Sequence, residues 1–88
     1  MRRPRSQGDY AKALLLHEDC LAQRRASLGA NHPDTLSSMN NLATLYYSQG
    51  DYAKALIFYE EAMKAAEEKG YPKAKVFRSN YNACLSKM

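Results

Sequence analysis

The sequence predicts an all-α fold, a right-handed α-α superhelix built from stacked pairs of helices. The main observation is an internal duplication: the nine residues SQGDYAKAL occupy positions 6–14 and recur unchanged at positions 48–56, which is a 42-residue shift. Repeats spaced by about 20 to 50 residues are typical of stacked helical arrays. The second observation is that apolar residues recur at intervals of three and four, which is the period of an amphipathic helix. We therefore expect four helices in the order B-A-B-A, where A and B are the first and second helices of one repeat.

This pattern also predicts how the chain is organised. We expect residues 1–7 to be a disordered lead, because they are polar and contain a proline. The array itself should cover the rest of the chain in three parts. They are the second half of one repeat (8–29), a complete repeat (33–70) and the first half of a third repeat (73–88).

The first expected helix lies within residues 8–29. Gly8 should break the chain, Asp9 can cap a helix by accepting hydrogen bonds from its first turn, and Gly29 should end it. Residues at three-and-four spacing place one stripe along this B helix. The stripe consists of Tyr10, Ala13, Leu14, His17, Cys20, Leu21, Arg24 and Leu28.

The complete repeat begins with an A helix that follows the linker. Pro33 suits the first helical position, and the charge of Asp34 is favourable at a helix N-terminus. The helix should end near Ser48. Its expected buried stripe consists of Leu36, Met39, Leu42, Ala43 and Tyr46.

The B helix of the complete repeat is predicted to start after a turn at Gly50. Asp51 should cap it and Gly70 should stop it. Its expected stripe repeats that of the first B helix at the same 42-residue shift. It consists of Tyr52, Ala55, Leu56, Tyr59, Ala62, Met63 and Ala66.

The last expected helix is a second A helix, because Tyr71-Pro72 stands where His32-Pro33 stands before the first A helix. Its expected stripe consists of Val76, Phe77, Tyr81, Leu85 and Met88. We align it with the earlier A helix at a 40-residue offset, so that Asn40, Ala43 and Leu45 correspond to Asn80, Ala83 and Leu85.

Specific motifs of the complete repeat resemble a known family, the tetratricopeptide repeat. They are Asn41-Leu42-Ala43, Tyr46-Tyr47, Gln49-Gly50-Asp51-Tyr52, Ala55, Tyr59 and Ala62. The 42-residue period and the linker LGANHPDTL at residues 28–36 further resemble the repeats of kinesin light chains and nephrocystin-like proteins. The resemblance covers residues 6–70 strongly and 71–88 weakly. It implies a scaffold or adaptor rather than an enzyme. Such a protein needs no cofactor and binds a peptide or protein on a concave face lined by A helices.

The resemblance also implies groove residues on both A helices. They are Asn40, Asn41, Thr44, Tyr47, Ser48, Asn80, Tyr81 and Cys84. An asparagine amide suits this role because it can both donate to and accept from a peptide backbone. Kinesin-light-chain grooves accept acidic peptides, with which the net charge of +4 is compatible. Family members that grip a C-terminal carboxylate need a further A helix and a basic residue where Tyr81 stands, so we do not expect that clamp.

Two other groups of residues suggest sites. His17 and Cys20 lie three apart and could suggest a metal site, but the 42-residue shift places them at the packing positions of Tyr59 and Ala62, so we expect no metal. No catalytic motif is present. Arg24-Arg25-Ala26-Ser27-Leu28 matches the preference of basophilic kinases and makes Ser27 a candidate phosphosite.

Composition limits the remaining alternatives. Basic residues are scattered except at Arg2, Arg3 and Arg5, so the chain lacks a clear nucleic-acid footprint. No segment reaches the ~18 apolar residues of a membrane span, and no signal sequence is recognisable, so we expect a cytoplasmic protein with free thiols and no membrane partner.

Three alternatives to peptide binding on the concave face are kept open. A basic helical-repeat binder of nucleic acid is favoured by the net charge. It is disfavoured because RNA-reading helical repeats have periods of ~35 residues and read bases from successive repeats. A structural fragment of a longer array would have no ligand of its own. Finally, the unpaired end helices could associate head to tail between chains.

Overall fold

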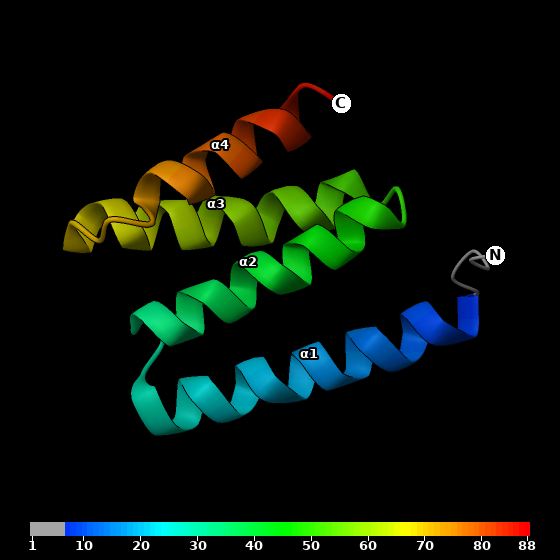
Figure 1. Cartoon of the computed structure of the whole chain (residues 1–88), viewed down its shortest axis with the longest axis horizontal. Helices are drawn as coiled ribbons and strands as arrows, with labels where there is room; N and C mark the ends of the chain where they lie inside the picture. Colours follow the sequence, from blue (N-terminus) through cyan, green and yellow to red (C-terminus); the bar gives the residue numbers. More distant parts are fainter. Residues whose placement is uncertain (1–6) are drawn as a thin grey trace, which may run out of the picture.

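A computed structural model of the chain describes residues 7–88, with residues 7–9 described for the backbone only, and this part contains four helices (Figure 1). They are α1 (Gln7–Leu28), α2 (Pro33–Ser48), α3 (Tyr52–Lys69) and α4 (Ala74–Leu85). No residue between 7 and 88 lies in a strand. The prediction of an all-α fold with four helices is confirmed.

The helices follow one another as an antiparallel array. Figure 1 shows α1 along one edge, α2 between α1 and α3, and α4 lying on α3. Each helix therefore packs mainly on its neighbours in the sequence, as expected when short linkers join antiparallel helices. α1 and α3 take the place of B helices, and α2 and α4 take the place of A helices.

The first helix begins earlier than the sequence predicts. α1 starts at Gln7, so Gly8 and Asp9 are helical and Gly8 does not break the chain. In the second copy of the same letters, Gly50 has a φ of 85° and turns the chain between α2 and α3. A glycine permits this conformation but does not impose it, and within residues 7–88 the second copy is the one that follows a helix, α2. The rest of the predicted disordered lead, residues 1–6, lies outside the described part of the chain.

The central repeat has defined helix ends. His32 precedes α2, and its Nδ1 accepts a hydrogen bond from the backbone N–H of Asp34 at 3.1 Å. As predicted, Asp51 caps α3: its carboxylate accepts a hydrogen bond from the backbone N–H of Lys54 at 3.4 Å. Gly70 follows α3 with a φ of 70°, the left-handed conformation that often ends helices. These contacts explain why α2 starts after His32 and why α3 starts after Asp51 and ends before Gly70.

The core is centred on α2 and α3. All five residues of the predicted stripe of α2 are buried, and Ala55, Tyr59, Ala62 and Ala66 are buried on α3. Three of these four buried residues of α3 are alanines, whose small side chains let helix axes approach, while the larger Tyr59 fills the space beside them.

The two outer helices bury much less. On α1 only Leu21 is fully buried among the described residues, and Leu28, predicted to pack, is exposed. A helix with one neighbour can bury only one face. α1 is held to α2 partly by polar contacts, since Arg24 Nη1 donates to the Asp34 carbonyl at 3.1 Å and to Ser38 Oγ at 3.0 Å.

On α4 the predicted stripe is partly wrong. Phe77 is buried and Tyr81 is half-buried, as expected, but Val76, Leu85 and Met88 are exposed. The fully buried position near the end of the helix is Cys84 instead. The physical reason is the rotational setting of α4 on α3, which is described below.

Candidate functional site

α2 and α4 are the two A-type helices, and polar contacts join them directly. The side-chain amide of Asn80 donates to Asn40 Oδ1 at 3.0 Å, and Lys73 Nζ donates to Ser37 Oγ at 3.4 Å. The Tyr71 hydroxyl donates to the Asn31 carbonyl at 3.0 Å, which joins the linkers that precede the two helices. We refer to the surface formed by α2, α4 and these linkers as the α2–α4 surface.

Several predicted groove residues lie on this surface with polar groups available. Asn41 and Ser48 are exposed on α2, and Asn40 is half-buried beside Asn80. The Asn40–Asn80 bond uses one donor and one acceptor, so each amide keeps further hydrogen-bonding capacity. A ligand could reach these four residues, and their part in binding stays a prediction.

Other predicted groove residues are occupied by contacts inside the protein. The Thr44 hydroxyl donates to the Asn40 carbonyl at 3.0 Å and lies 2.8 Å from the Tyr59 hydroxyl. The Tyr47 ring packs edge-on against the Tyr52 ring, with the centroids 5.2 Å apart. Tyr47 is half-buried and still presents part of its ring. Thr44 and Tyr47 therefore support the surface as well as lining it.

Cys84 does not lie on the surface. Its side chain is fully buried, and its Sγ donates to the Tyr52 carbonyl at 3.4 Å. Burial raises the pKa of the Cys84 thiol, because the thiolate would lose its hydration. Cys84 is a core residue, and it cannot contact a ligand in this structure.

The setting of α4 explains the position of Cys84. The 40-residue offset would bury Ala83 and Leu85 like their partners on α2, but both are exposed. A 39-residue offset aligns the two buried residues of α4, Phe77 and Cys84, with buried residues of α2, and it also aligns Pro72 with Pro33. At this offset the inward positions of α2 and α4 correspond as Thr35 with Ala74, Ser38 with Phe77, Leu42 with Tyr81 and Leu45 with Cys84. The 40-residue alignment is therefore wrong for packing.

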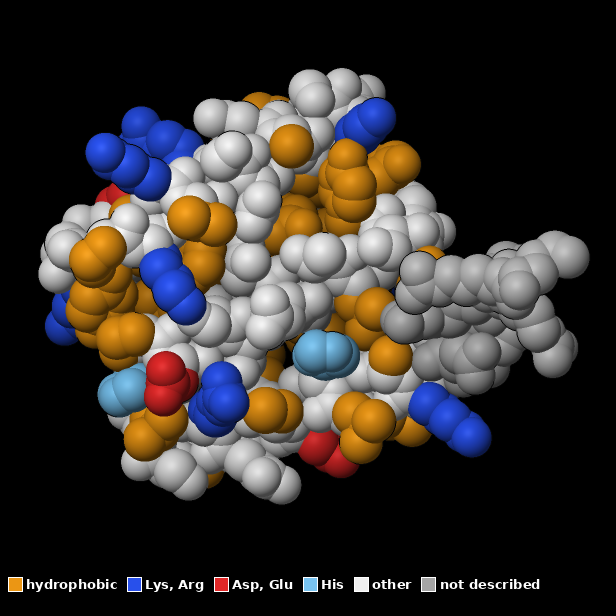
Figure 2. Space-filling model, viewed as in Figure 1, with side chains coloured by type: hydrophobic (Ala, Val, Ile, Leu, Met, Phe, Trp, Pro, Cys, Tyr) orange, Lys and Arg blue, Asp and Glu red, His pale blue; other side chains and the backbone are white. Residues whose placement is uncertain are grey.

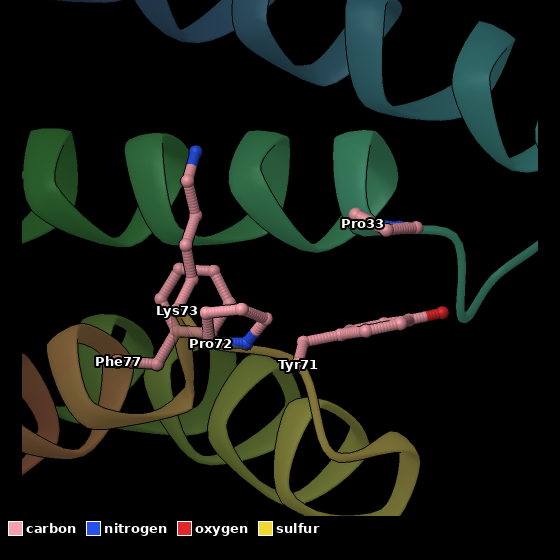
Figure 3. A pocket seen from close by; sticks show the side chains of 5 residues that line it. All are labelled: Pro33, Tyr71, Pro72, Lys73 and Phe77. Carbon is pink, nitrogen blue, oxygen red and sulfur yellow. The ribbon is translucent and has the colours of Figure 1, made fainter.

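An apolar pocket opens at the N-terminal ends of α2 and α4. It encloses about 290 Å³ and is lined by Pro33, Tyr71, Pro72, Lys73 and Phe77. Figure 3 shows the flat ring of Tyr71 opposite Pro33 and the Lys73 side chain reaching towards α2. The pocket thus combines an almost wholly apolar lining with one cation at its edge.

Sequence reasoning missed this pocket. The sequence did contain a hint of the pocket: His32-Pro33 and Tyr71-Pro72 occupy equivalent positions before the two A helices. Equivalence in the sequence does not show that two linkers lie side by side, and only the packing of α2 and α4 on α3 brings the two prolines together.

A second cavity of about 230 Å³ lies on another side of α2, between α1 and α3. Leu36 and Met39 contribute apolar lining. Charged side chains surround it, including Arg25 and Glu61, whose Nη2 and Oε2 atoms are 3.2 Å apart. Because Arg25 and Glu61 already pair with each other, this cavity is a weaker candidate than the α2–α4 surface.

The metal site that His17 and Cys20 could suggest has no support in the described residues. Between residues 10 and 88, no group of three or more histidine, cysteine, aspartate or glutamate side chains could hold a metal ion. Cys20 Sγ lies 4.0 Å from Ser38 Oγ, in the contact between α1 and α2. Cys20 thus packs against α2, as its position in the repeat predicts.

Ser27 is exposed in the last turn of α1, where a kinase could reach it. Phosphorylation there stays a prediction. Incubation with a basophilic kinase and mass spectrometry would test it, and a chain left unmodified at Ser27 would dismiss it.

None of the helices described between residues 7 and 88 combines the length and the apolar character that crossing a bilayer requires.

The helix pairs, their shared core and the surface on successive A helices define the class as a helical-repeat array. Within that class, a family model described as "Tetratricopeptide repeat" matches residues 5–68, and the chain belongs to this family. A comparison with curated proteins gave no match. Tetratricopeptide repeats generally bind proteins or peptides, and membership of this family supports a protein-interaction role in general.

Proposed function

We propose that the α2–α4 surface binds an extended peptide segment of a partner protein. Such binding would resemble that of the grooves of kinesin light chains. The observation that carries the proposal is that an apolar pocket and a hydrogen-bonded amide pair lie on the same two helices: Phe77 lines the pocket, and one turn further along α4 Asn80 donates to Asn40. Such a combination suits an extended ligand, because the amides can hold its backbone while the pocket accepts a side chain.

The preferred ligand is an acidic peptide with one bulky apolar side chain. The pocket volume of about 290 Å³ is large enough for an aromatic side chain, and its proline and aromatic walls favour one. Lys73 is exposed at the pocket edge and could pair with a neighbouring carboxylate of the ligand. The net charge of +4 would assist the encounter with an acidic segment.

A peptide selection tests this proposal. A displayed library of random peptides would be selected on the whole chain, and the affinities of the selected peptides measured by fluorescence anisotropy. We expect enriched peptides with an aromatic residue next to aspartate or glutamate. Asn41→Ala should weaken their binding by about fivefold or more, which corresponds to the loss of one hydrogen bond.

The matched control is Gln23→Ala, which removes an exposed amide from α1, away from this surface. Lys73→Glu should reverse the preference for acidic peptides. If no peptides are enriched, the proposal is wrong and the alternative of a scaffold fragment without its own ligand gains support. If Gln23→Ala and Asn41→Ala weaken binding equally, the peptides bind elsewhere and the proposal is also wrong.

The rival function is nucleic-acid binding, which the positive net charge favours. Figure 2 shows lysine and arginine side chains in separate positions over one face rather than in a continuous basic stripe. A nucleic-acid binder should hold single-stranded RNA with an affinity that falls steeply as salt is added. Absence of binding even at low salt would remove this alternative.

A further inference from the structure

α3 shows how a B helix of this chain recognises an A helix. The Phe58 ring stacks on the Tyr46 ring of α2, with centroids 5.8 Å apart and planes at 9°. Lys54 Nζ lies 5.6 Å from the centroid of the same Tyr46 ring. The Tyr59 hydroxyl lies 2.8 Å from the hydroxyl of Thr44, also on α2. This contact is a template for the other B helix.

α1 repeats the start of α3 but has no A helix on this face within the described chain. The positions equivalent to Lys54, Phe58 and Tyr59 are Lys12, Leu16 and His17. Phe58 is half-buried under its partner, whereas Leu16 is 69% exposed. Burying such a side chain would remove apolar surface from water, which favours a partner here.

The neighbouring leucine shows that this exposure is specific. Leu15 is 62% exposed, but its equivalent in the complete repeat, Ile57, is 59% exposed as well. Position 15 therefore faces solvent even when an A helix is present. Of the two leucines, Leu16 is therefore the one whose exposure marks a missing neighbour.

The other end of the array does not supply the missing helix. α2 carries Leu36, Met39, Ala43 and Tyr46, all of which are buried. At the 39-residue offset, the equivalent residues of α4 are Lys75, Arg78, Asn82 and Leu85, all of which are exposed. Docking α4 of a second copy on α1 would thus bury the ammonium of Lys75 and the amide of Asn82, which is costly without partners, together with Arg78, which already pairs with Glu67 of α3. A polar outer face is the usual device that ends a repeat array. This disfavours the head-to-tail association between chains.

We propose that the face of α1 formed by Lys12, Ala13, Leu16 and His17 binds one amphipathic helix with the chemistry of α2. That helix would carry a stripe of leucine, methionine and alanine, followed by an aromatic side chain in the place of Tyr46. The aromatic ring would cover Leu16 and lie under Lys12, as Tyr46 lies against Phe58 and Lys54. This interaction surface is separate from the α2–α4 surface.

The internal duplication allows a direct test. A copy of residues 31–47 is fused to the N-terminal side of Ser6 and replaces residues 1–5. Because residues 6–14 are identical to residues 48–56, the new junction has the same sequence as the turn between α2 and α3. We expect the midpoint of thermal unfolding, followed by circular dichroism, to rise by about 5 to 10 °C.

Two leucine variants make the test specific. Leu16→Asp should remove at least half of this rise, whereas Leu15→Asp at the adjacent, similarly exposed position should retain it. Each variant is compared with its own form without the added helix, so any direct effect on stability cancels. A copy in which the added tyrosine equivalent to Tyr46 is serine should give a smaller rise.

The proposal fails if the added helix gives no rise, or if Leu16→Asp and Leu15→Asp reduce the rise equally. A wild-type chain whose mass by light scattering increases with concentration, and no longer does so in Lys75→Glu, would instead support docking by α4.

Discussion

α1 and α3 both contain the repeated residues YAKAL (10–14 and 52–56), and yet equivalent residues of the two helices differ in burial. Ala55 is fully buried and Ala13 is only half-buried, although both follow the same tyrosine by three positions. Tyr59 is buried against two helices where His17 is half-buried. Among the helices of residues 7–88, α3 has a neighbour on each side, α2 and α4, and α1 packs on α2. The comparison teaches that a repeated sequence fixes which face of a helix is apolar, while the neighbours decide whether that face is buried.

The largest test of this comparison substitutes the equivalent positions 59 and 17. Tyr59→Ala should destabilise the chain by about 3 to 5 kcal/mol, as expected when a buried aromatic side chain leaves a cavity. His17→Ala should cost less than about 1 kcal/mol, because its site is half-open. Urea unfolding followed by circular dichroism measures both. Equal costs would contradict the proposed difference between the two helices.

A second pair compares positions 58 and 16. Phe58→Ala should cost about 2 kcal/mol, since it removes a half-buried ring and its stack on Tyr46. Leu16→Ala should change the free energy of unfolding by no more than about 0.5 kcal/mol, because Leu16 lies in water. A cost for Leu16→Ala near that of Phe58→Ala would show that α1 is covered in solution.

A smaller effect should appear at alkaline pH. Burial raises the pKa of Tyr59 above 10.0, despite an opposing contribution from its hydrogen bond with Thr44. Burial and the Glu18 carboxylate, which accepts a hydrogen bond from the Tyr46 hydroxyl at 3.0 Å, raise the pKa of Tyr46. A raised pKa in the folded state gives stability that is complete below pH 10 and lost as the pH rises through the folded values.

Tyr46→Phe and Tyr59→Phe should therefore lose less stability than wild type between about pH 8 and about pH 10.5. The measurement is the midpoint of thermal unfolding at both values. A wild-type decline that is unchanged in both variants would show that these hydroxyls do not cause it.

The smallest expected effect concerns the ion pair between the two B helices. Arg25 and Glu61 lie 3.2 Å apart with both side chains well exposed. Glu61→Gln should change the free energy of unfolding by no more than about 0.5 kcal/mol, and the difference should vanish in about 0.5 M salt. A larger, salt-independent cost would mean that this pair holds α1 in place.

Much of the candidate surface could be predicted from the sequence, but unevenly. Asn40, Asn41 and Ser48 are accessible on α2 as expected, because the motifs around them define that helix closely. Cys84 was misplaced because α4 matches α2 weakly, and a shift of one residue rotates a helix by about 100°. The pocket at Pro33 and Phe77 was not foreseen, since segments that are distant in the sequence come together to form it.

The sequence by itself determined the four helices, their order, the caps at Asp51 and Gly70 and the buried stripe of α2. These depend on local spacing and on the duplication, both of which are visible in one dimension. Only the tertiary structure decided the register of α4, the pocket beside it and the exposure of Leu16. Those features depend on which helix lies opposite a given face and at what rotation, and packing between helices sets both.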